Sequence, residues 1–351
     1  MRKDIYIWSI LCVFISISGG CLDDIDLKVP PEQQETIIVQ GRLIKKQDHA
    51  HIEVQVTNLF DFTPESRRTI VLRSAEIFEK NGGKRSLEKT TLNTYTTRVE
   101  LNDPTFPIEY GNEYWIRVET LEDQVFTSIP DMLFRVPKTD TIRFEYLPKE
   151  DNPFQINNNV KFFASGNILD NVDDKKSRIR FFKRKTFRVT DCLKQLCYVD
   201  NFTNLDNIVT LDGNTFPDYK YKDLEVFKDF VSFEYAQGNY FSLFAESLSD
   251  QAYQYWNESS SLFLRTGNMF EEPVGTHFTN IRNEDQEAMD NVFGFFYATQ
   301  IDTFRLYVDS SLVGTPLLAC PPLRKAPECL PCCNCLGMTG SSLEKPDFWI
   351  N

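Results

Sequence analysis

Alternating apolar and polar positions predict short β-strands in the first third of the chain. Residues 51–56 alternate strictly, residues 36–44 are rich in β-branched side chains, and residues 69–79 lead into an Asn-Gly-Gly turn sequence. Further strand-like segments follow at regular spacing over residues 93–101, 113–120 and 124–129. Roughly seven short strands within about 100 residues are typical of an immunoglobulin-like β-sandwich. We expect this sandwich over residues 36–137.

A break in the pattern separates this sandwich from a second β domain. Pro130 and Pro137 interrupt the strands, and strand-like segments then resume. We expect residues 138–319 to form a second β-sandwich or a barrel-like domain. A cysteine-rich tail over residues 320–351 closes the chain. The predicted fold is therefore mainly β.

One segment of the second domain has helical spacing. Ser247 is suited to cap a helix, and Asp250 stands three residues later. The positions that fall on one helical face are Leu248, Ala252, Tyr255, Ser259 and Phe263. We expect this helix to pack over a sheet or over the end of the barrel.

The first 20 residues have the layout of a secretory signal peptide. Arg2 and Lys3 precede an apolar run over residues 5–17, and Ser-Gly-Gly then leads into Cys21. The run is shorter than the roughly 20 residues that a transmembrane helix needs. Small residues followed by cysteine are typical of lipoprotein processing, so we expect Cys21 to become the first residue of the mature protein and to carry acyl chains such as palmitate. Ordinary secretion is the alternative.

An acidic tether over residues 21–35 follows the expected cleavage site. Asp23, Asp24 and Asp26 lie beside the anchor, where an anionic membrane surface would repel them. They resemble an acidic export signal that sends lipoproteins to the outer face of the outer membrane. We therefore expect a lipid-anchored protein that faces the cell exterior, with the lipid bilayer as its partner through Cys21. A solvated acidic linker is the alternative.

Composition excludes one class of partner. The chain carries a net charge of −13, and loss of the signal peptide makes it about −14. Nucleic acid phosphates need a basic face, so we expect no nucleic acid partner. The 29 Phe and 14 Tyr residues favour β structure with well-packed cores.

Motifs for catalysis are not found. The sequence has no nucleophile elbow, zinc-protease motif, phosphate-binding loop or dinucleotide fingerprint. His49 and His51 would share one face of a strand, but no carboxylate is fixed beside them to complete a metal site. We expect no catalytic residues, no metal and no cofactor. A secreted hydrolase stays as an alternative, because 51 acidic residues create many chance carboxylate pairs.

The cysteines point to disulfide bonds. After Cys12 leaves with the signal and Cys21 is acylated, seven remain as candidates: Cys192, Cys197, Cys320, Cys329, Cys332, Cys333 and Cys335. Thiols oxidise outside the cytoplasm, and an odd number leaves at least one free or bonded to another molecule. Zinc is the alternative for the tail, where three cysteines are spaced by two residues. The spacing of Cys192 and Cys197 is consistent with a bridged hairpin turn.

Several short sequences occur in a recognisable order along the chain. In the first domain they are residues 38–41, 74–77, 114–118 and 126–128. In the second domain and tail they are residues 240–243, 247–249, 252–253, 256, 267–270, 273–275, 280, 294–296 and 345–349. In this combination they resemble the domain of unknown function 4249 family of Bacteroidota outer-membrane lipoproteins. The tail departs from the family pattern, because Cys332 and Cys333 are adjacent and Met338 and Thr339 separate two glycines.

This resemblance implies an exported lipoprotein that is usually encoded beside a TonB-dependent outer-membrane transporter, and it supplies no catalytic residues. We therefore expect a non-enzymatic binding or accessory subunit of an outer-membrane β-barrel transporter. The ligand, a small molecule or a peptide, is not defined by the sequence. A structural or assembly role in an outer-membrane complex is the other alternative.

Overall fold

A computed structural model describes residues 36–58, 70–149, 157–169, 176–201, 208–263, 278–285, 292–320 and 334–350. In these ranges the protein contains three β-sheets, one α-helix and one disulfide bond. The predicted mainly β class is therefore confirmed. Within the same ranges, no helix is both long and apolar enough to cross a membrane.

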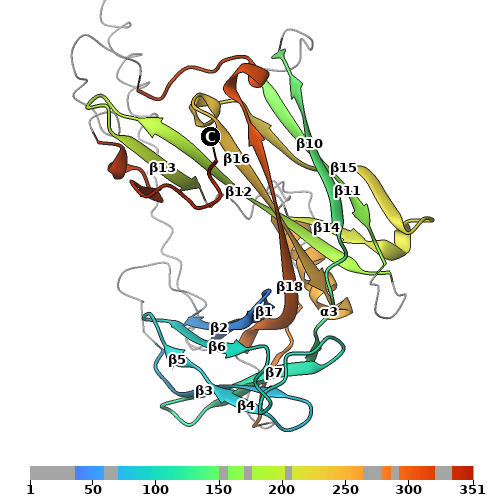
Figure 1. The fold of residues 1–351 in the computed structure, drawn as a ribbon. Helices are drawn as coiled ribbons and strands as arrows, with labels where there is room; N and C mark the ends of the chain where they lie inside the picture. Colours follow the sequence, from blue (N-terminus) through green and yellow to red (C-terminus); the bar gives the residue numbers. More distant parts are fainter. Residues whose placement is uncertain are drawn as a thin grey trace, which may run out of the picture.

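The largest sheet has ten strands and runs through both halves of the molecule (Figure 1). Its path is β19-β13-β12-β16-β18-β1-β2-β6-β5, and β14 pairs with β12 beside it. The bounds are β1 (Ile37–Lys45), β2 (His49–Asn58), β5 (Glu88–Lys89), β6 (Thr94–Glu100), β12 (Arg178–Thr190), β13 (Leu196–Asn201), β14 (Val209–Asp212), β16 (Asn239–Leu248), β18 (Val292–Val308) and β19 (Ser341–Ser342).

The long strand β18 connects the two halves. Residues 292–300 pair in parallel with β1, whereas residues 301–308 pair antiparallel with β16. Gly294 adopts a φ of +128°, and a Cβ at this position would overlap the carbonyl of Val39 on β1. Only glycine fits this close approach without strain.

A six-stranded sheet packs against β1, β2 and β6 to form the lower half (Figure 1). It consists of β3 (Leu72–Glu79), β4 (Lys84–Ser86), β7 (Glu113–Thr120), β8 (Val125–Ser128), β9 (Asp131–Met132) and β17 (Ile281–Asn283). Strict alternation explains the packing, since every second residue of β7 is buried. β17 of this sheet comes from outside residues 36–137, and so does the first half of β18 in the sheet that packs against it. The chain therefore returns to complete the lower half.

The upper half is built in the same way from two layers. A three-stranded sheet of β10 (Thr139–Leu147), β11 (Asn159–Asn167) and β15 (Lys220–Phe230) packs against β12, β16 and β18. Phe162 of β11 and Phe241 of β16 stack across the core with ring centroids 3.7 Å apart. Short 3-10 helices lie at Gly213–Thr215, Phe233–Tyr235, Ser310–Val313 and Cys335–Gly337.

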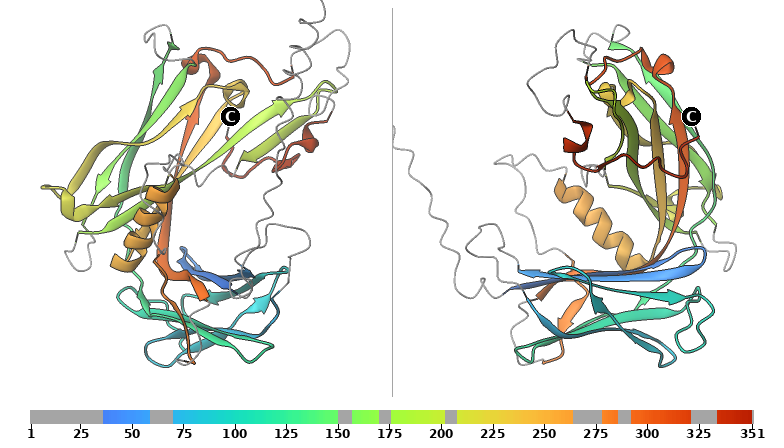
Figure 2. Two further views of the ribbon diagram at one scale, coloured as in Figure 1. Left: turned by 180° about the vertical axis from the view of Figure 1, so that it is seen from behind. Right: turned by 60° about the vertical axis from the view of Figure 1, so that its left-hand side comes forward.

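The predicted helix is confirmed as α3 (Asp250–Phe263). Its capping residue was predicted wrongly, because the side chain of Ser249 accepts the backbone N–H of Ala252. Ser247 is still part of β16 and donates its hydroxyl to the carbonyl of Phe134. The helix packs against β12, β14 and β16 at the junction of the two halves (Figure 2).

Candidate binding site

A pocket of about 500 Å³ lies where β1, β2, β12, β18 and α3 meet. This volume falls within the range of small-molecule sites. Its lining residues are Gln40, Gly41, Arg42, Glu53, Gln55, Arg180, Tyr255, Trp256, Ser259, Leu262, Phe295 and Tyr297. Four aromatic rings and five side chains with charged or amide groups therefore converge on one hollow.

The polar side chains face this pocket because alternate residues of a strand point to opposite faces of the sheet. On β1, Val39 and Leu43 are buried in the lower core, so Gln40 and Arg42 between them point to the opposite face. The same alternation on β12 buries Phe181 in the upper core and turns Arg180 away from it. The pocket thus uses the outer faces of strands whose inner faces hold the two cores.

Each arginine of the pocket is paired with a glutamate directly across the sheet. Arg42 on β1 lies opposite Glu53 on β2, with Nη2 and Oε2 3.4 Å apart. Arg180 on β12 lies opposite Glu246 on β16, and its Nη1 is 2.9 Å from Oε2. Because Glu246 is 0% exposed, loss of Arg180 would leave a buried charge without its partner, which typically costs about 3–5 kcal/mol.

The tyrosine beneath these pairs is held in its protonated form. Burial, followed by the charge of Glu246, raises the pKa of Tyr297 well above its ordinary value. Arg180 donates to the Tyr297 hydroxyl over 3.5 Å. Burial alone would lower the pKa of Arg42, but the nearby Tyr297, Glu246 and Glu53 outweigh it and raise the pKa. Arg42 thus carries its charge at neutral pH.

The aromatic side chains of the pocket pack around Arg180. The guanidinium carbon of Arg180 lies 3.4 Å from the ring centroid of Trp256, a close cation–π contact. Tyr255, the neighbour of Trp256 on α3, stacks on Phe295 of β18 at a centroid distance of 4.4 Å. The wall is therefore held by contacts from three different elements.

Two hydrogen-bond donors in this wall lack an acceptor. Among the described residues, Nε of Arg180 and Nε1 of Trp256 are buried and have no hydrogen-bond partner. A buried donor without an acceptor costs about 1–3 kcal/mol. An oxygen atom from a bound molecule would remove this cost.

A second cavity, of about 750 Å³, lies at the N-terminal end of α3. Arg178 there pairs with Asp212 and Asp250, and Lys176 donates to the carbonyl of Phe216. Among the described residues, Nε of Arg178 and Oε1 of Gln251 are also buried without a hydrogen-bond partner. The difference lies in the aromatic lining, which within the described ranges is Phe134 alone in this cavity and four rings in the first pocket. We therefore place the binding site in the first pocket.

Asp131 at the edge of this second cavity joins three parts of the fold. Its carboxylate accepts the Ser249 hydroxyl at 2.5 Å and the backbone N–H of Ala298 at 2.9 Å. Complete burial raises the pKa of Asp131 to about 7, and the charge of Asp250 adds to this effect. This carboxyl holds β9, the start of α3 and β18 together.

Paired carboxylates do occur, around a buried lysine of the upper half. Lys185 contacts Asp229 at 2.8 Å and also pairs with Glu234. Burial would lower the pKa of Lys185, but the two acidic charges raise it. The Tyr235 hydroxyl donates to Asp229 at 2.9 Å. Lys185 balances one of the two negative charges and Tyr235 donates a hydrogen bond to Asp229, so this cluster fits a structural role.

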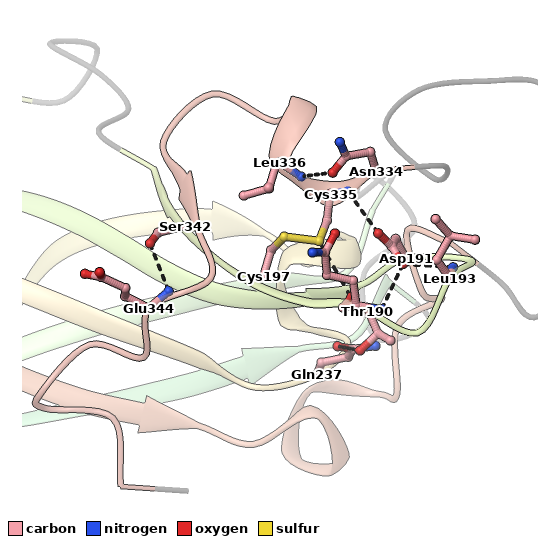
Figure 3. Close-up of a disulfide and its surroundings, with 11 residues drawn as sticks. Thr190, Asp191, Leu193, Cys197, Gln237, Asn334, Cys335, Leu336, Ser342 and Glu344 are labelled. Atoms are coloured by element: carbon pink, nitrogen blue, oxygen red, sulfur yellow. Dashed lines mark hydrogen bonds between the residues drawn. A yellow bond between two sulfur atoms is a disulfide. The ribbon is translucent and has the colours of Figure 1, made fainter.

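The candidate cysteines that the structure describes lie at the upper end of the molecule. Cys197 and Cys335 form a disulfide between β13 and the tail, with Cα atoms 5.9 Å apart (Figure 3). The local bridge between Cys192 and Cys197 was therefore a wrong expectation, because the sulfur of Cys197 bonds to the tail instead. Cys192 and Cys320 belong to the same buried cluster. Cys329, Cys332 and Cys333 lie outside the described residues.

The other candidate site positions either do not line the pocket, although His51 lies beside it, or are outside the described residues. His49 contacts Asp48 at 2.7 Å, and His51 lies 3.9 Å from Glu53. Across the described ranges, no group of three potential metal ligands was found. Cys21 and the export-signal residues Asp23, Asp24 and Asp26 precede residue 36, where the description begins.

The sequence did not mark the pocket residues as a site, although Tyr255 and Ser259 lie on the predicted helical face and Trp256 is one of the positions that resemble the family. Arg42, Arg180 and Trp256 belong to different elements, and no short motif connects them. A further signal was on β12, where Arg178, Arg180 and Arg184 share one strand face with Phe182.

Most of the chain matches a known protein family. The family described as a domain of unknown function (DUF4249) matches residues 23–305. This range includes every residue that lines the pocket. No curated protein matches the chain.

Proposed function

Because the chain belongs to the DUF4249 family, we propose a function that its fold and pocket support. The protein acts as a non-enzymatic ligand-binding subunit, anchored through Cys21 in the outer membrane and facing the cell exterior, that serves a TonB-dependent transporter. The pocket beside α3 carries this proposal, because it combines aromatic surface with converging polar groups and two unsatisfied donors.

The state of the acidic groups favours binding over catalysis. Glycoside hydrolysis requires one carboxyl group that can donate a proton and a second that acts as base or nucleophile. In this pocket Glu53 is paired with Arg42, and the nearby Glu246 is paired with Arg180. Each carboxylate is therefore held in an ion pair within the protein, and neither is left free to act on a glycosidic bond.

The sequence before the fold supports the membrane location. Residues 22–35 would form a tether that spans at most about 50 Å when fully extended. A protein held in the membrane plane meets a membrane partner at high effective concentration, so a modest interface suffices. In this proposal the lower β half is an immunoglobulin-like sandwich that lies next to the tether.

An assembly role is the second candidate, and one surface feature favours it. Leu193, Leu196 and Leu336 lie around the Cys197–Cys335 disulfide and are 75%, 38% and 43% exposed. Exposed apolar side chains that gather in one region often mark a protein contact. This end of the molecule would then hold the barrel partner.

Purification from native membranes in mild detergent tests the proposed function. We expect a large β-barrel protein to copurify in nearly equal amount, and deletion of the gene to impair uptake of one class of nutrient. The Trp256→Ala variant should still copurify with the barrel but should not restore uptake. Recovery of the lipoprotein alone in several mild detergents, with normal uptake in the deletion strain, would refute the accessory role.

A further inference from the structure

We propose that the pocket beside α3 binds an uncharged saccharide, with its first sugar ring against Trp256 and Arg42. This inference rests on the proposed binding function and names the chemical class of its ligand. It follows from three properties of the pocket: its charge balance, its aromatic surface and its arrangement of donors and acceptors.

Charge balance disfavours an ionic ligand. Arg42 and Arg180 are matched by Glu53 and Glu246 at 3.4 Å and 2.9 Å, so the site carries no net charge. A carboxylate or phosphate ligand would have to compete with these two acids, and Glu246 is completely buried. A cationic ligand would meet two guanidinium groups at the same place. A neutral ligand avoids both costs.

The aromatic residues supply the second property. Trp256, Tyr255 and Phe295 all line the hollow, and Trp256 and Tyr255 are only partly buried. The faces of aromatic rings carry partial negative charge, which attracts the C–H groups on the face of a sugar ring. The Arg180 guanidinium 3.4 Å from the Trp256 centroid holds the indole in place before a ligand arrives. A wall that is already ordered loses little entropy on binding.

Hydrogen-bonding groups around the hollow match hydroxyl groups, which both donate and accept. The unsatisfied Nε of Arg180 and Nε1 of Trp256 need oxygen acceptors. In the same lining, Glu53 offers acceptor oxygens, and Gln55 offers both donors and acceptors, as does Gln40, which also bonds to Tyr255. Neighbouring hydroxyls of one sugar can satisfy both kinds of group at once.

Aromatic and arginine side chains continue along the strand beyond the pocket. Arg180 also lies over the ring of Phe182 at 5.3 Å, and Phe182 stacks on Phe244 of β16 at a centroid distance of 4.7 Å. Arg184 lies over Phe244 at 5.7 Å. Phe182 and Phe244 are partly buried and lie on the face opposite to the upper core. This line of rings would contact further sugar units of a linear oligosaccharide.

Titration calorimetry on the full chain, purified in mild detergent, tests the inference. The probes are glucose, mannose and xylose with their short linear oligomers, oligogalacturonate as the charged counterpart, and alanyl dipeptides. We expect one neutral series to bind saturably. Trp256→Ala and Arg42→Gln should each weaken binding roughly tenfold. Trp115→Phe, on the six-stranded sheet, is the matched control and should leave affinity unchanged.

Chain length provides the second measurement. Phe244→Ala should weaken the oligomers several-fold and leave the single sugar unchanged, whereas Trp256→Ala should weaken both. Binding of oligogalacturonate or a dipeptide through Trp256 and Arg42, without any neutral saccharide, would overturn the ligand class but not the binding function. Absence of binding by all neutral probes to a folded protein that still copurifies with a barrel would also overturn it. Release of shortened sugars would replace binding with hydrolysis.

Discussion

Replacement of Asp131 by asparagine should change how the stability of the protein depends on pH. Asp131 accepts hydrogen bonds from the Ser249 hydroxyl and the Ala298 backbone, and it has no buried cation beside it among the described residues. Burial raises its pKa from 3.8 to about 7. The protonated carboxyl can donate to Ser249 while its other oxygen accepts from Ala298. Asparagine reproduces this neutral arrangement with its amide group.

The expected magnitude follows from the pKa difference between the folded and unfolded states. A rise from 3.8 to about 7 corresponds to about 4 kcal/mol in favour of the protonated form. The folded protein binds the proton more tightly, so this stabilisation is complete below pH 4. It is lost as the pH rises from about 4 to about 7 and does not change further above pH 7. Asparagine does not titrate, so the variant should lack this loss.

Urea unfolding of a secreted Cys21→Ser background at pH 5 and pH 8 measures the effect. The unfolding free energy of Asp131→Asn minus that of the parent should grow by about 2–3 kcal/mol between the two pH values. Asp131→Ala is the control, because it removes both acceptors and should destabilise the protein at both pH values. An Asp131→Asn penalty that is equal at pH 5 and pH 8 would show that Asp131 is ionised throughout, and the reasoning would be wrong.

Three further predictions concern the tail and the anchor. Cys335→Ser should lower the unfolding free energy by about 2–5 kcal/mol under oxidising conditions, and it should not change this free energy in the presence of a reductant. Non-reducing peptide mapping of the parent protein should find the Cys197–Cys335 disulfide; reduced cysteines with bound zinc would contradict it. Trp349→Ala should cost about 3–5 kcal/mol in urea unfolding, because the indole is 1% exposed and packs against Tyr198 and Tyr240; a change below 1 kcal/mol, on the order of a surface substitution, would contradict this packing. Cys21→Ala should release the protein from membranes, and membrane retention of this variant would refute the anchor. Replacement of Asp23, Asp24 and Asp26 by alanine should leave the protein anchored but protected from protease that is added to intact cells.

The parts of the fold that depend on local patterns could be predicted from the sequence. Alternation identified most strands, and helical spacing with a capping serine identified α3 to within a residue or two at its start. The cap itself was misplaced because Ser247 and Ser249 both precede the helix. Strand pairing decides between them, since the pairing of β16 with β12 extends to Leu248.

Features that depend on distant pairing could not be predicted. Alternation shows which face of a strand is buried, but it does not show which strand lies beside it. The parallel pairing of β1 with residues 292–300 therefore left no local signal. The same limit applies to Cys197, whose partner Cys335 follows 138 residues later, while Cys192 is only five residues away.

The location of the pocket has the same physical origin. Because β18 pairs with β1 through its first half and with β16 through its second, the outer faces of both halves meet at residues 300 and 301. Arg42 and Arg180 come from opposite sides of this junction, and the rings of α3 close the third side. A change in the angle between the halves would separate the two arginines. The contact of Asp131 with Ser249 and Ala298 lies at the same junction and restrains that angle, so ligand affinity in Asp131→Ala should fall even though Asp131 does not line the pocket.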